Sequence, residues 1–331
     1  MVKDLVTFSI IIPFQSWSIF LDDCIEHIRQ LTFKEFEVIL LPDDEVQVPK
    51  LFQGLPIRVH VTGKVNPSTK RNLGVSKAHG QYLAFIDDDA YPRIDWLDIG
   101  LKVLQDNNIA AVGGPAITPK DDPFLSRVSG AVFLSSFSGG FPERYISCPP
   151  TRKVQDWPTV NLIVKKYAYD KTGGFIEKYW PGEDTKFCLD LVLNGFSILY
   201  YPELVVYHHR RPKLKNHMRQ IGSYGFHRGI LAIKDPQTSR KFIYFLPSLF
   251  VIFLIGGGIL ALFHPSIKII YKVGLVFYGL GMLIALKDIL KHESRAVAIA
   301  SIPYIFLTHL WYGIRFIYGL GNRHYKSSLG R

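Results

Sequence analysis

Residues 70–92 read KRNLGVSKAHGQYLAFIDDDAYP, and this stretch decides the fold. The segment from Lys70 to His79 has the length of a helix and is closed by Gly80, a residue that favours helix ends. Tyr82 to Ile86 follows as a short apolar strand that runs directly into three aspartates. A helix, a buried strand and polar residues at the strand's carboxyl end are typical of an α/β sheet that binds a ligand at that edge.

The same alternation continues on both sides of this stretch. Phe8 to Pro13 is a short, β-branched run ended by proline, which suits a parallel strand buried on both faces. Further helices are expected at Phe20–Leu31 and Thr185–Leu193, and further strands at Phe36–Leu41, Ile57–Val61 and Ser197–Tyr201. This pattern predicts a Rossmann-like, mixed but mostly parallel α/β sheet. Residues 113–158 are rich in Gly, Pro and Ser, and are expected to form loops and short strands.

The part of the chain after Lys241 is far more apolar than the part before it. Ile243–Phe263 contains no charged residue and is long enough to cross about 30 Å of hydrocarbon, which takes about 20 helical residues. Ile269–Leu286 and Ala296–Ile314 are interpreted as further spans. We therefore expect a catalytic domain at 1–212, a basic connector at 213–241, two to three transmembrane helices at 242–320 and a basic tail at 321–331.

The net charge of +11 is compatible with nucleic acid, an anionic membrane surface or anionic substrates. Much of the charge lies between Arg210 and Lys241, directly before the first apolar run, which favours membrane lipids over nucleic acid. Three spans would place the basic C-terminal tail outside the cell, against the positive-inside rule. Either the third segment is partly interfacial or the rule fails there.

Cellular location follows from the N-terminus, the cysteines and the flanks of the apolar runs. The first residues show no signal-peptide pattern, and the three cysteines lack metal-ligand spacing, which is compatible with a reducing compartment. Lys241 before the first span and Lys287 after the second are expected to face the cytoplasm. The sequence thus predicts a multi-pass protein of the cell membrane with a cytoplasmic catalytic domain.

The triplet Asp87-Asp88-Asp89 is the most informative short motif. Carboxylates at a strand end, two positions apart, suit Mg²⁺ or Mn²⁺ with open positions for diphosphate oxygens. An acidic turn before Pro92 is the alternative interpretation. Lys70 and Arg71, at the start of the preceding helix, are placed to meet phosphates, although a solvated helix start would have the same sequence.

Two later motifs carry further candidate groups. Glu183 and Asp184 begin a helix after Gly182, where a carboxylate is well placed to take a proton from an acceptor hydroxyl, or simply to cap the helix. His208, with His209 as the spare candidate, follows a strand and is a candidate metal ligand. The acceptor pocket is expected to be lined by Trp180, Gly182, Trp157 and Asn161, with core packing as the alternative for the aromatic side chains.

Five segments in this order, SIIIPF, LPDDE, KRNLGVSKAHGQYLAFIDDDAYP, GGF and WPGED, resemble glycosyltransferase family 2 of the GT-A fold over about Ser9 to Arg211. The resemblance implies a UDP- or GDP-sugar donor and Mg²⁺ or Mn²⁺ as cofactor. It assigns the nucleotide sugar to Pro13, Asp43, Lys70, Arg71, Asn72, Asp87 and Asp88, the metal to Asp87, Asp89 and His208, and catalysis to Asp184 with Glu183 beside it. The chain departs from the family's usual acidic turn, because it has Pro42-Asp43-Asp44-Glu45 there.

The expected activity is inverting transfer of a sugar to a lipid-linked saccharide or glycan in cell-surface polysaccharide or glycoconjugate synthesis. A polyprenyl-phosphate glycosyltransferase is the close alternative. A non-catalytic membrane protein that binds nucleotide sugars is the alternative from another class, and the acids at both the metal and base positions argue against it. A nucleotidyltransferase is disfavoured because the early part of the chain has no glycine-rich phosphate loop.

Overall fold

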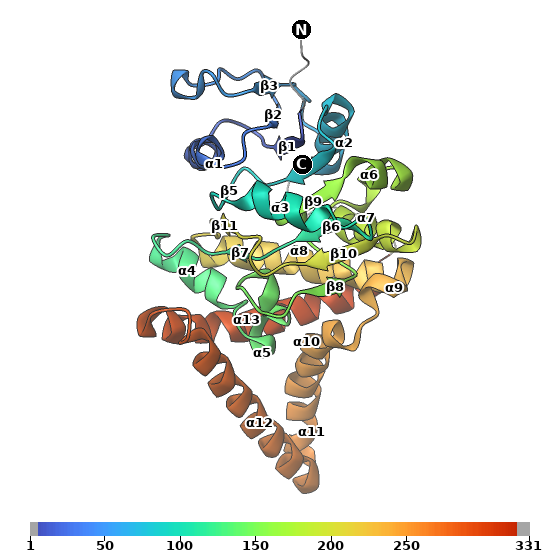
Figure 1. The fold of residues 1–331 in the computed structure, drawn as a ribbon. Coiled ribbons are helices and arrows are strands. Elements are labelled where there is room, and N and C mark those ends of the chain that lie inside the picture. Colours follow the sequence, from blue (N-terminus) through green and yellow to red (C-terminus); the bar gives the residue numbers. More distant parts are fainter. Residues whose placement is uncertain (1–5, 323–331) are drawn as a thin grey trace. The chain divides into compact units, whose positions relative to one another are not determined.

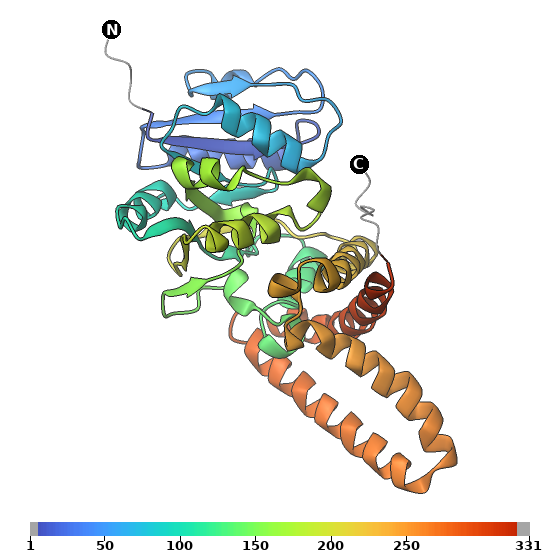
Figure 2. The ribbon, with the colours of Figure 1, turned by 90° about the vertical axis from the view of Figure 1, so that its right-hand side faces the viewer.

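The computed structural model describes residues 6–322, which fall into two compact units. Unit 1 comprises the described residues up to Pro119 together with Ile146–His209. Unit 2 comprises Lys120–Tyr145 and the described residues from Arg210 onward. Figures 1 and 2 draw the two units as ribbons in two views. Most of the predicted basic tail at 321–331 lies outside the described residues.

Unit 1 is built on a sheet whose eight described strands follow the order β3-β2-β1-β4-β9-β6-β10-β8. These strands are β1 (Phe8–Pro13), β2 (Phe36–Leu41), β3 (Ile57–Val59), β4 (Tyr82–Phe85), β6 (Ile109–Gly113), β8 (Arg152–Val154), β9 (Leu162–Lys165) and β10 (Ser197–Tyr200). All six residues of β1 and of β2 are buried, as their mainly apolar sequences predict. The two polar members, Ser9 and Glu37, satisfy each other, since the Ser9 hydroxyl donates to Glu37 Oε1 at 2.6 Å.

The sheet is mixed and mostly parallel, which confirms the predicted fold class. β1 pairs in parallel with β2 and β4, β2 with β3, and β10 with β6. Only β9 and β8, among the described strands of this sheet, run antiparallel to their neighbours. Parallel pairing brings the carboxyl ends of β1, β2 and β4 to the same edge, so that the residues following them lie together.

Helices cover both faces of this sheet. They are α1 (Ile19–Gln30), α2 (Pro67–Lys77), α3 (Trp96–Leu104), α6 (Lys166–Thr172) and α7 (Glu183–Leu193), with short 3₁₀ turns η1 (Lys50–Phe52), η3 (Thr159–Asn161) and η4 (Glu177–Tyr179). α1 and α3 share a hydrophobic core with Ile10 and Ile12, whereas α2, α6 and α7 share the other core with Ile11. The alternation of strand side chains thus divides the core into two layers.

Helix α2 begins earlier than its apolar residues predict. It starts at Pro67 and not at Lys70, because the side chain of Asn66 accepts a hydrogen bond from the Thr69 N–H at 3.0 Å. Asparagine is a favoured N-cap residue, and proline is well tolerated at the first helical position. The extra turn makes Lys70 and Arg71 residues of the helix interior, where both side chains are buried.

A second, small sheet completes unit 1. It consists of β5 (Ala90–Pro92), β11 (Val206–His208) and β7 (Ala116–Ile117), in the order β5-β11-β7. β11 lies antiparallel to β5 with His208 opposite Ala90. This register brings the segment after the last strand next to the acidic triplet, although more than a hundred residues of sequence separate them.

Unit 2 includes Lys120–Tyr145, a segment that lies within the predicted catalytic domain at 1–212. Within residues 113–158, expected to form loops and short strands, the structure has α4 (Phe124–Ala131), α5 (Ser136–Gly139) and the 3₁₀ turn η2 (Pro142–Arg144). Residues 120–145 pack in unit 2 and not in unit 1. Glycine and serine make α4 a weak helix by propensity, so tertiary contacts stabilise it. Arg127 pairs with Glu293, and Ser129 bonds to His217 at 2.7 Å.

The apolar C-terminal part of unit 2 forms a helical hairpin (Figure 2). α10 (Phe242–Ile252), the π-helical turn η5 (Phe253–Gly257) and α11 (Gly258–Phe263) form one continuous helix, and α12 (Pro265–Ile289) returns beside it. Both arms are long and apolar enough to cross a membrane, and only 11% of each arm's most apolar stretch is buried in the protein. Exposed apolar surfaces of this size suit contact with lipid.

The third apolar segment differs from the hairpin. α13 (Arg295–Leu320) is also long enough to span, but 44% of its most apolar stretch is buried. It packs along α8 (Leu214–Lys234), which the short helix α9 (Pro236–Ser239) follows. Glycines permit this close packing: a Cβ on Gly229 would lie 2.4 Å from the Phe316 carbonyl oxygen, and one on Gly319 would lie 2.2 Å from that of Phe226. The basic connector is thus mainly the helix α8, packed against α13.

Candidate functional site

The acidic triplet lies at the carboxyl edge of the main sheet. Asp87 to Asp89 connect β4 to β5, beside the ends of β1 and β2. Buried Pro13 closes β1, and Asp43 follows β2 with 8% of its surface exposed. The predicted grouping of these residues at one edge follows from the parallel pairing of the three strands.

The side chains of Asp89, in this loop, and His208, at the end of β11, lie next to each other. His208 Nε2 lies 3.0 Å from Asp89 Oδ1, with 14% of the His208 and 19% of the Asp89 side chain exposed. The antiparallel pairing of β11 with β5 places them there. His209, the spare candidate, turns elsewhere, since its Nε2 lies 3.2 Å from Asp23 Oδ2 and its ring packs on Phe20. Of the two histidines, His208 is therefore the one whose ring faces the acidic triplet.

Arg71 joins the acidic triplet to helix α7. Its guanidinium donates to Asp87 Oδ1 and to Glu183 Oε1, each at 2.8 Å, and the residue is 4% exposed. Burial by itself would lower the pKa of Arg71, but the carboxylates of Asp87, Glu183 and Asp184 raise it above its ordinary value. The arginine therefore stays charged and fixes two segments of the chain, one from each side of the site.

The start of α7 separates its two carboxylates. Gly182 has φ +131°, a backbone conformation that favours glycine, and this turn directs the chain into the helix. Glu183 is 6% exposed and points inward, where it bonds to Arg71 and to the Gly182 N–H at 2.9 Å. Asp184 is only partly buried, and its Oδ1 accepts from the Thr185 N–H at 2.7 Å. The two acids thus have different surroundings despite being adjacent in sequence.

Lys70 and Asn72 are held within the framework of unit 1. Lys70 is fully buried, donates to the carbonyls of Phe14 and Leu41, and pairs with Asp43 at 2.5 Å. It thus ties together the ends of β1 and β2. Asn72 donates to the Phe175 carbonyl at 2.8 Å and accepts from the Phe175 N–H at 3.0 Å. Both residues position the loops around the site, and this use of their polar atoms argues against direct contact with a nucleotide.

Two of the predicted acceptor-pocket residues are core residues. Asn161 is fully buried, accepts from Trp96 Nε1 at 2.9 Å and donates to the carbonyls of Pro115 and Leu204. Trp157 is 1% exposed and donates to the Gly114 carbonyl at 3.0 Å. Their side chains hold the core together and have no surface open to an acceptor. Trp180 is partly exposed, so its predicted role is compatible with its position.

Asp89 and His208 carry donor groups of the kind that can hold a divalent metal. No group of three or more His, Cys, Asp or Glu side chains among residues 6–322 is already arranged as a metal site. Asp89 Oδ1 and His208 Nε2 lie 3.0 Å apart, the distance of an imidazole–carboxylate pair, and carboxylate and imidazole are both groups that bind divalent metals. Asp87, two residues earlier, supplies a further carboxylate, at present paired with Arg71.

Comparison with known proteins identifies the family of the N-terminal part of the chain. Residues 9–168 match the model of "Glycosyl transferase family 2". The pre-mycofactocin glycosyltransferase of Mycobacterium tuberculosis is 26% identical over 185 residues, which cover 56% of this chain and 39% of that protein. A dolichyl N-acetyl-α-D-glucosaminyl phosphate 3-β-D-2,3-diacetamido-2,3-dideoxy-β-D-glucuronosyltransferase of Methanococcus voltae is 24% identical over 183 residues, 54% of this chain and 56% of that protein. The chain therefore spans about two-fifths to just over half of these relatives.

A solved structure resembles the fold over most of the chain. It is the mannosyltransferase PcManGT of Pyrobaculum calidifontis in complex with GDP-Man and Mn²⁺, with a TM-score of 0.54 and 14% identity. The similarity covers 86% of this chain and 88% of the other. The mixed sheet, the acidic triplet after β4 and the family match over residues 9–168 agree, so the chain carries a glycosyltransferase family 2 domain of the GT-A fold.

Proposed function

We propose that this protein transfers a glycosyl group from a nucleoside-diphosphate sugar to an acceptor held at the membrane, with inversion at the anomeric carbon. The observation that carries the proposal is the convergence of Asp89 and His208 beside Asp87, with Arg71 linking Asp87 to the start of α7. A diphosphate-binding edge and a candidate base are thereby joined through one buried arginine.

Each residue has a separate task in this reaction. Asp87, Asp89 and His208 would hold the divalent metal, which supplies positive charge to offset the leaving nucleoside diphosphate. Asp184 takes the proton from the acceptor hydroxyl, because it is the more exposed of the two acids at the start of α7. Glu183, paired with Arg71, keeps the helix start in place. Attack from the face opposite the leaving group inverts the configuration.

The donor is a nucleotide sugar with UDP or GDP as its nucleotide. The fold neighbour was solved with GDP-Man and Mn²⁺, which supports a metal-bound nucleotide sugar in this fold. Asp43 and Pro13, at the ends of β2 and β1, lie where the nucleoside is expected in a sheet that binds ligands at its carboxyl edge. Asp43 is held by Lys70, so the lysine acts on the donor through the position of this acid.

The acceptor is membrane-bound, either a lipid-linked saccharide or a glycan. The exposed hairpin of α10–α11 and α12 anchors the chain in the bilayer as two spans, while α13 stays with α8 at the surface. This topology keeps the basic flanks of the hairpin on the cytoplasmic side without breaking the positive-inside rule. The named substrate of the Methanococcus relative is a dolichyl phosphate derivative, which supports a lipid-linked acceptor.

Turnover of nucleotide sugars by the purified full-length protein tests this proposal. UDP- and GDP-sugars are incubated with Mn²⁺ or Mg²⁺, and release of the nucleoside diphosphate is measured with and without a membrane lipid extract. We expect release to require the metal, to rise with the extract and to be lost in Asp89→Ala. Asp121→Ala, at an exposed acid outside the site, is the matched control. Full activity in EDTA, or in Asp89→Ala, would refute the metal assignment.

A further inference from the structure

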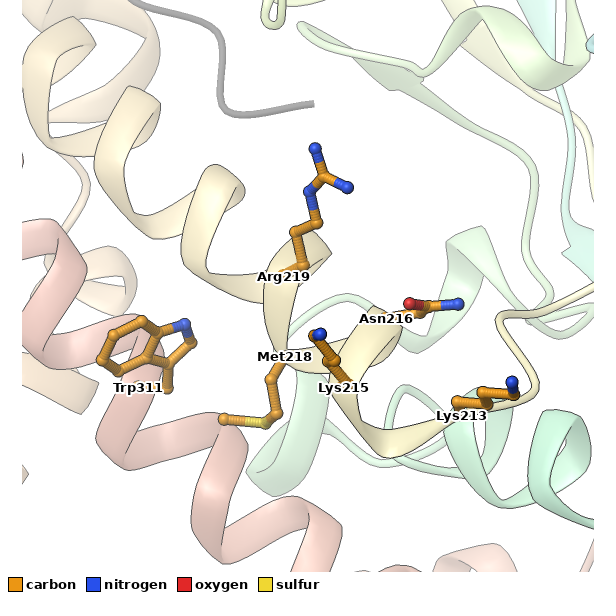
Figure 3. Close-up of a pocket in the computed structure, with 6 residues that line it drawn as sticks. All are labelled: Lys213, Lys215, Asn216, Met218, Arg219 and Trp311. Carbon is orange, nitrogen blue, oxygen red and sulfur yellow. The ribbon is translucent and has the colours of Figure 1, made fainter. Parts of the chain in front are cut away.

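Unit 2 contains a pocket that the proposed chemistry does not use. It has a volume of about 670 Å³ and lies between the first turns of α8 and the middle of α13 (Figure 3). Its lining consists of Lys213, Lys215, Asn216, Met218, Arg219 and Trp311. All six residues belong to unit 2, so the pocket is formed within one compact part of the chain.

The lining combines positive charge with an apolar wall. Lys213, Lys215 and Arg219 are three cations, and none of the six lining residues is acidic. Ammonium and guanidinium groups together with a side-chain amide are the donors that hold phosphate oxygens in proteins. On the other side, Trp311 and Met218 offer apolar surface. A ligand that fits both walls has an anionic head and an apolar remainder.

The pocket lies on helices that belong at a membrane surface. α8 and α13 pack side by side, and α13 also packs against α10, the first arm of the exposed apolar hairpin (Figure 1). Arg240 and Lys241 precede that arm, and such cations meet the headgroup region. Tryptophan is enriched at the same depth, because its ring is apolar and its N–H is polar. Trp311 is 38% exposed, in agreement with that environment.

We propose that this pocket binds the phosphate group of a membrane lipid, with Lys213, Lys215 and Arg219 holding the phosphate and Trp311 and Met218 contacting the start of the lipid chain. The inference rests on the proposed function in one respect, that the acceptor is lipid-linked. The phosphate has two possible sources, the acceptor lipid itself or a bulk anionic phospholipid. The pocket would hold the lipid phosphate at the level of α8 and α13, next to the membrane surface.

The test uses the full-length protein in a neutral detergent and measures lipid binding in mixed micelles by calorimetry. The probes are a polyprenyl phosphate, phosphatidic acid, uncharged polyprenol and inorganic phosphate. The pocket variant is Lys215→Gln/Arg219→Gln. The control is Lys102→Gln/Lys153→Gln, which removes the same charge from exposed positions of unit 1, outside the pocket.

We expect the polyprenyl phosphate and phosphatidic acid both to bind. The pocket variant should bind them about 30-fold more weakly, since it lacks two cations and each cation near an anionic headgroup contributes a factor of about five. The control variant should bind within about threefold of the parent, as expected for surface charges. Tighter binding of the polyprenyl phosphate assigns the site to the acceptor, and equal binding of both lipids assigns it to bulk phospholipid.

Three results would overturn the inference. They are equal binding of polyprenol, binding of inorganic phosphate as tight as that of the lipids, and equal losses in the pocket and control variants. Donor hydrolysis without acceptor is measured on every variant and reports whether unit 1 is intact. A protein that hydrolyses donor but binds no lipid phosphate refutes this inference alone. A protein that binds lipid phosphate but never turns over a donor refutes the proposed function alone.

Discussion

Adjacent acids at the start of α7 should respond differently to the same chemical change. Glu183→Gln and Asp184→Asn each replace a carboxylate by an amide of nearly the same shape. Glu183 is 6% exposed and bonds to the buried Arg71 at 2.8 Å, whereas Asp184 is partly exposed and bonds to the Thr185 N–H. We therefore expect the first change to lower stability and the second to lower turnover.

The surroundings of Glu183 set the size of the stability loss. Removing one partner of a buried ion pair outright costs about 3–5 kcal/mol. Glutamine keeps a neutral hydrogen bond to Arg71, and Asp87 still balances the arginine's charge, so we expect a smaller loss of about 2 kcal/mol. For a unit of this size that loss lowers the thermal midpoint by about 4–8 °C.

Asp184→Asn should leave the free energy of unfolding within about 0.5 kcal/mol, since asparagine can accept the same bond from the Thr185 N–H. Loss of a general base typically lowers turnover by about 10²-fold or more. Donor affinity should be unchanged, because the base acts only as attack begins.

The assay combines thermal unfolding, followed by tryptophan fluorescence, with initial rates and calorimetric donor affinity on the full-length protein. Glu177→Gln, at an exposed acid in the preceding turn, is the control for the loss of one negative charge. A near-parental rate in Asp184→Asn would remove the base assignment. Collapse of donor binding in that variant would place Asp184 in the metal or nucleotide site. Parental stability in Glu183→Gln would refute the structural role of the Arg71 pair.

Three further predictions concern the metal, the packing of unit 2 and pH. His208→Ala should weaken Mn²⁺ activation at least about 100-fold, measured by metal titration of the rate, since loss of even an outer-shell partner costs 10–100-fold. Gly229→Ala should lower the thermal midpoint, because its Cβ would lie 2.4 Å from the Phe316 carbonyl oxygen; Gly279→Ala, with open space around it, should not. Burial lowers the pKa of His217 from 6.5 to about 4. As pH falls, the unfolded chain therefore binds a proton at His217 before the folded chain does. Up to about 3 kcal/mol of stability should be lost between pH 6.5 and pH 4. Thermal unfolding measured at several pH values checks this, and His217→Gln should remove the dependence.

The sequence alone determined the elements whose signal is local. Mainly apolar runs predicted β1 and β2 with their observed bounds, and the aspartates after Ile86 fall at the strand end where they were expected. Hydrophobic runs bounded by turn residues carry this information directly, because a buried parallel strand tolerates few polar side chains. The long apolar segments of the C-terminal part were also predicted from local sequence, because about 20 consecutive apolar residues are the signal of a helix long enough to cross a membrane.

Contacts between distant residues were decided only by the tertiary structure. Helix α4 has serine and glycine where propensity would favour other residues, and it persists through its pairing with residues of α8 and of the turn before α13. The register of β11 against β5 determines that the ring of His208, and not that of His209, lies beside Asp89, since one step along a strand reverses the side on which a side chain lies.

The separate roles of Lys70, Arg71, Glu183 and Asp184 have the same origin. In the sequence they are two cations and two acids at helix starts, and each pair could equally belong to an ordinary solvent-exposed helix start. In the folded chain, burial compels Lys70 to satisfy strand-end carbonyls and Arg71 to pair with Asp87 and Glu183, and Asp184 is left the more exposed acid. A charge removed from water must find its partners, and which partners lie within reach is a property of the assembled sheet and helices, not of any local stretch of sequence.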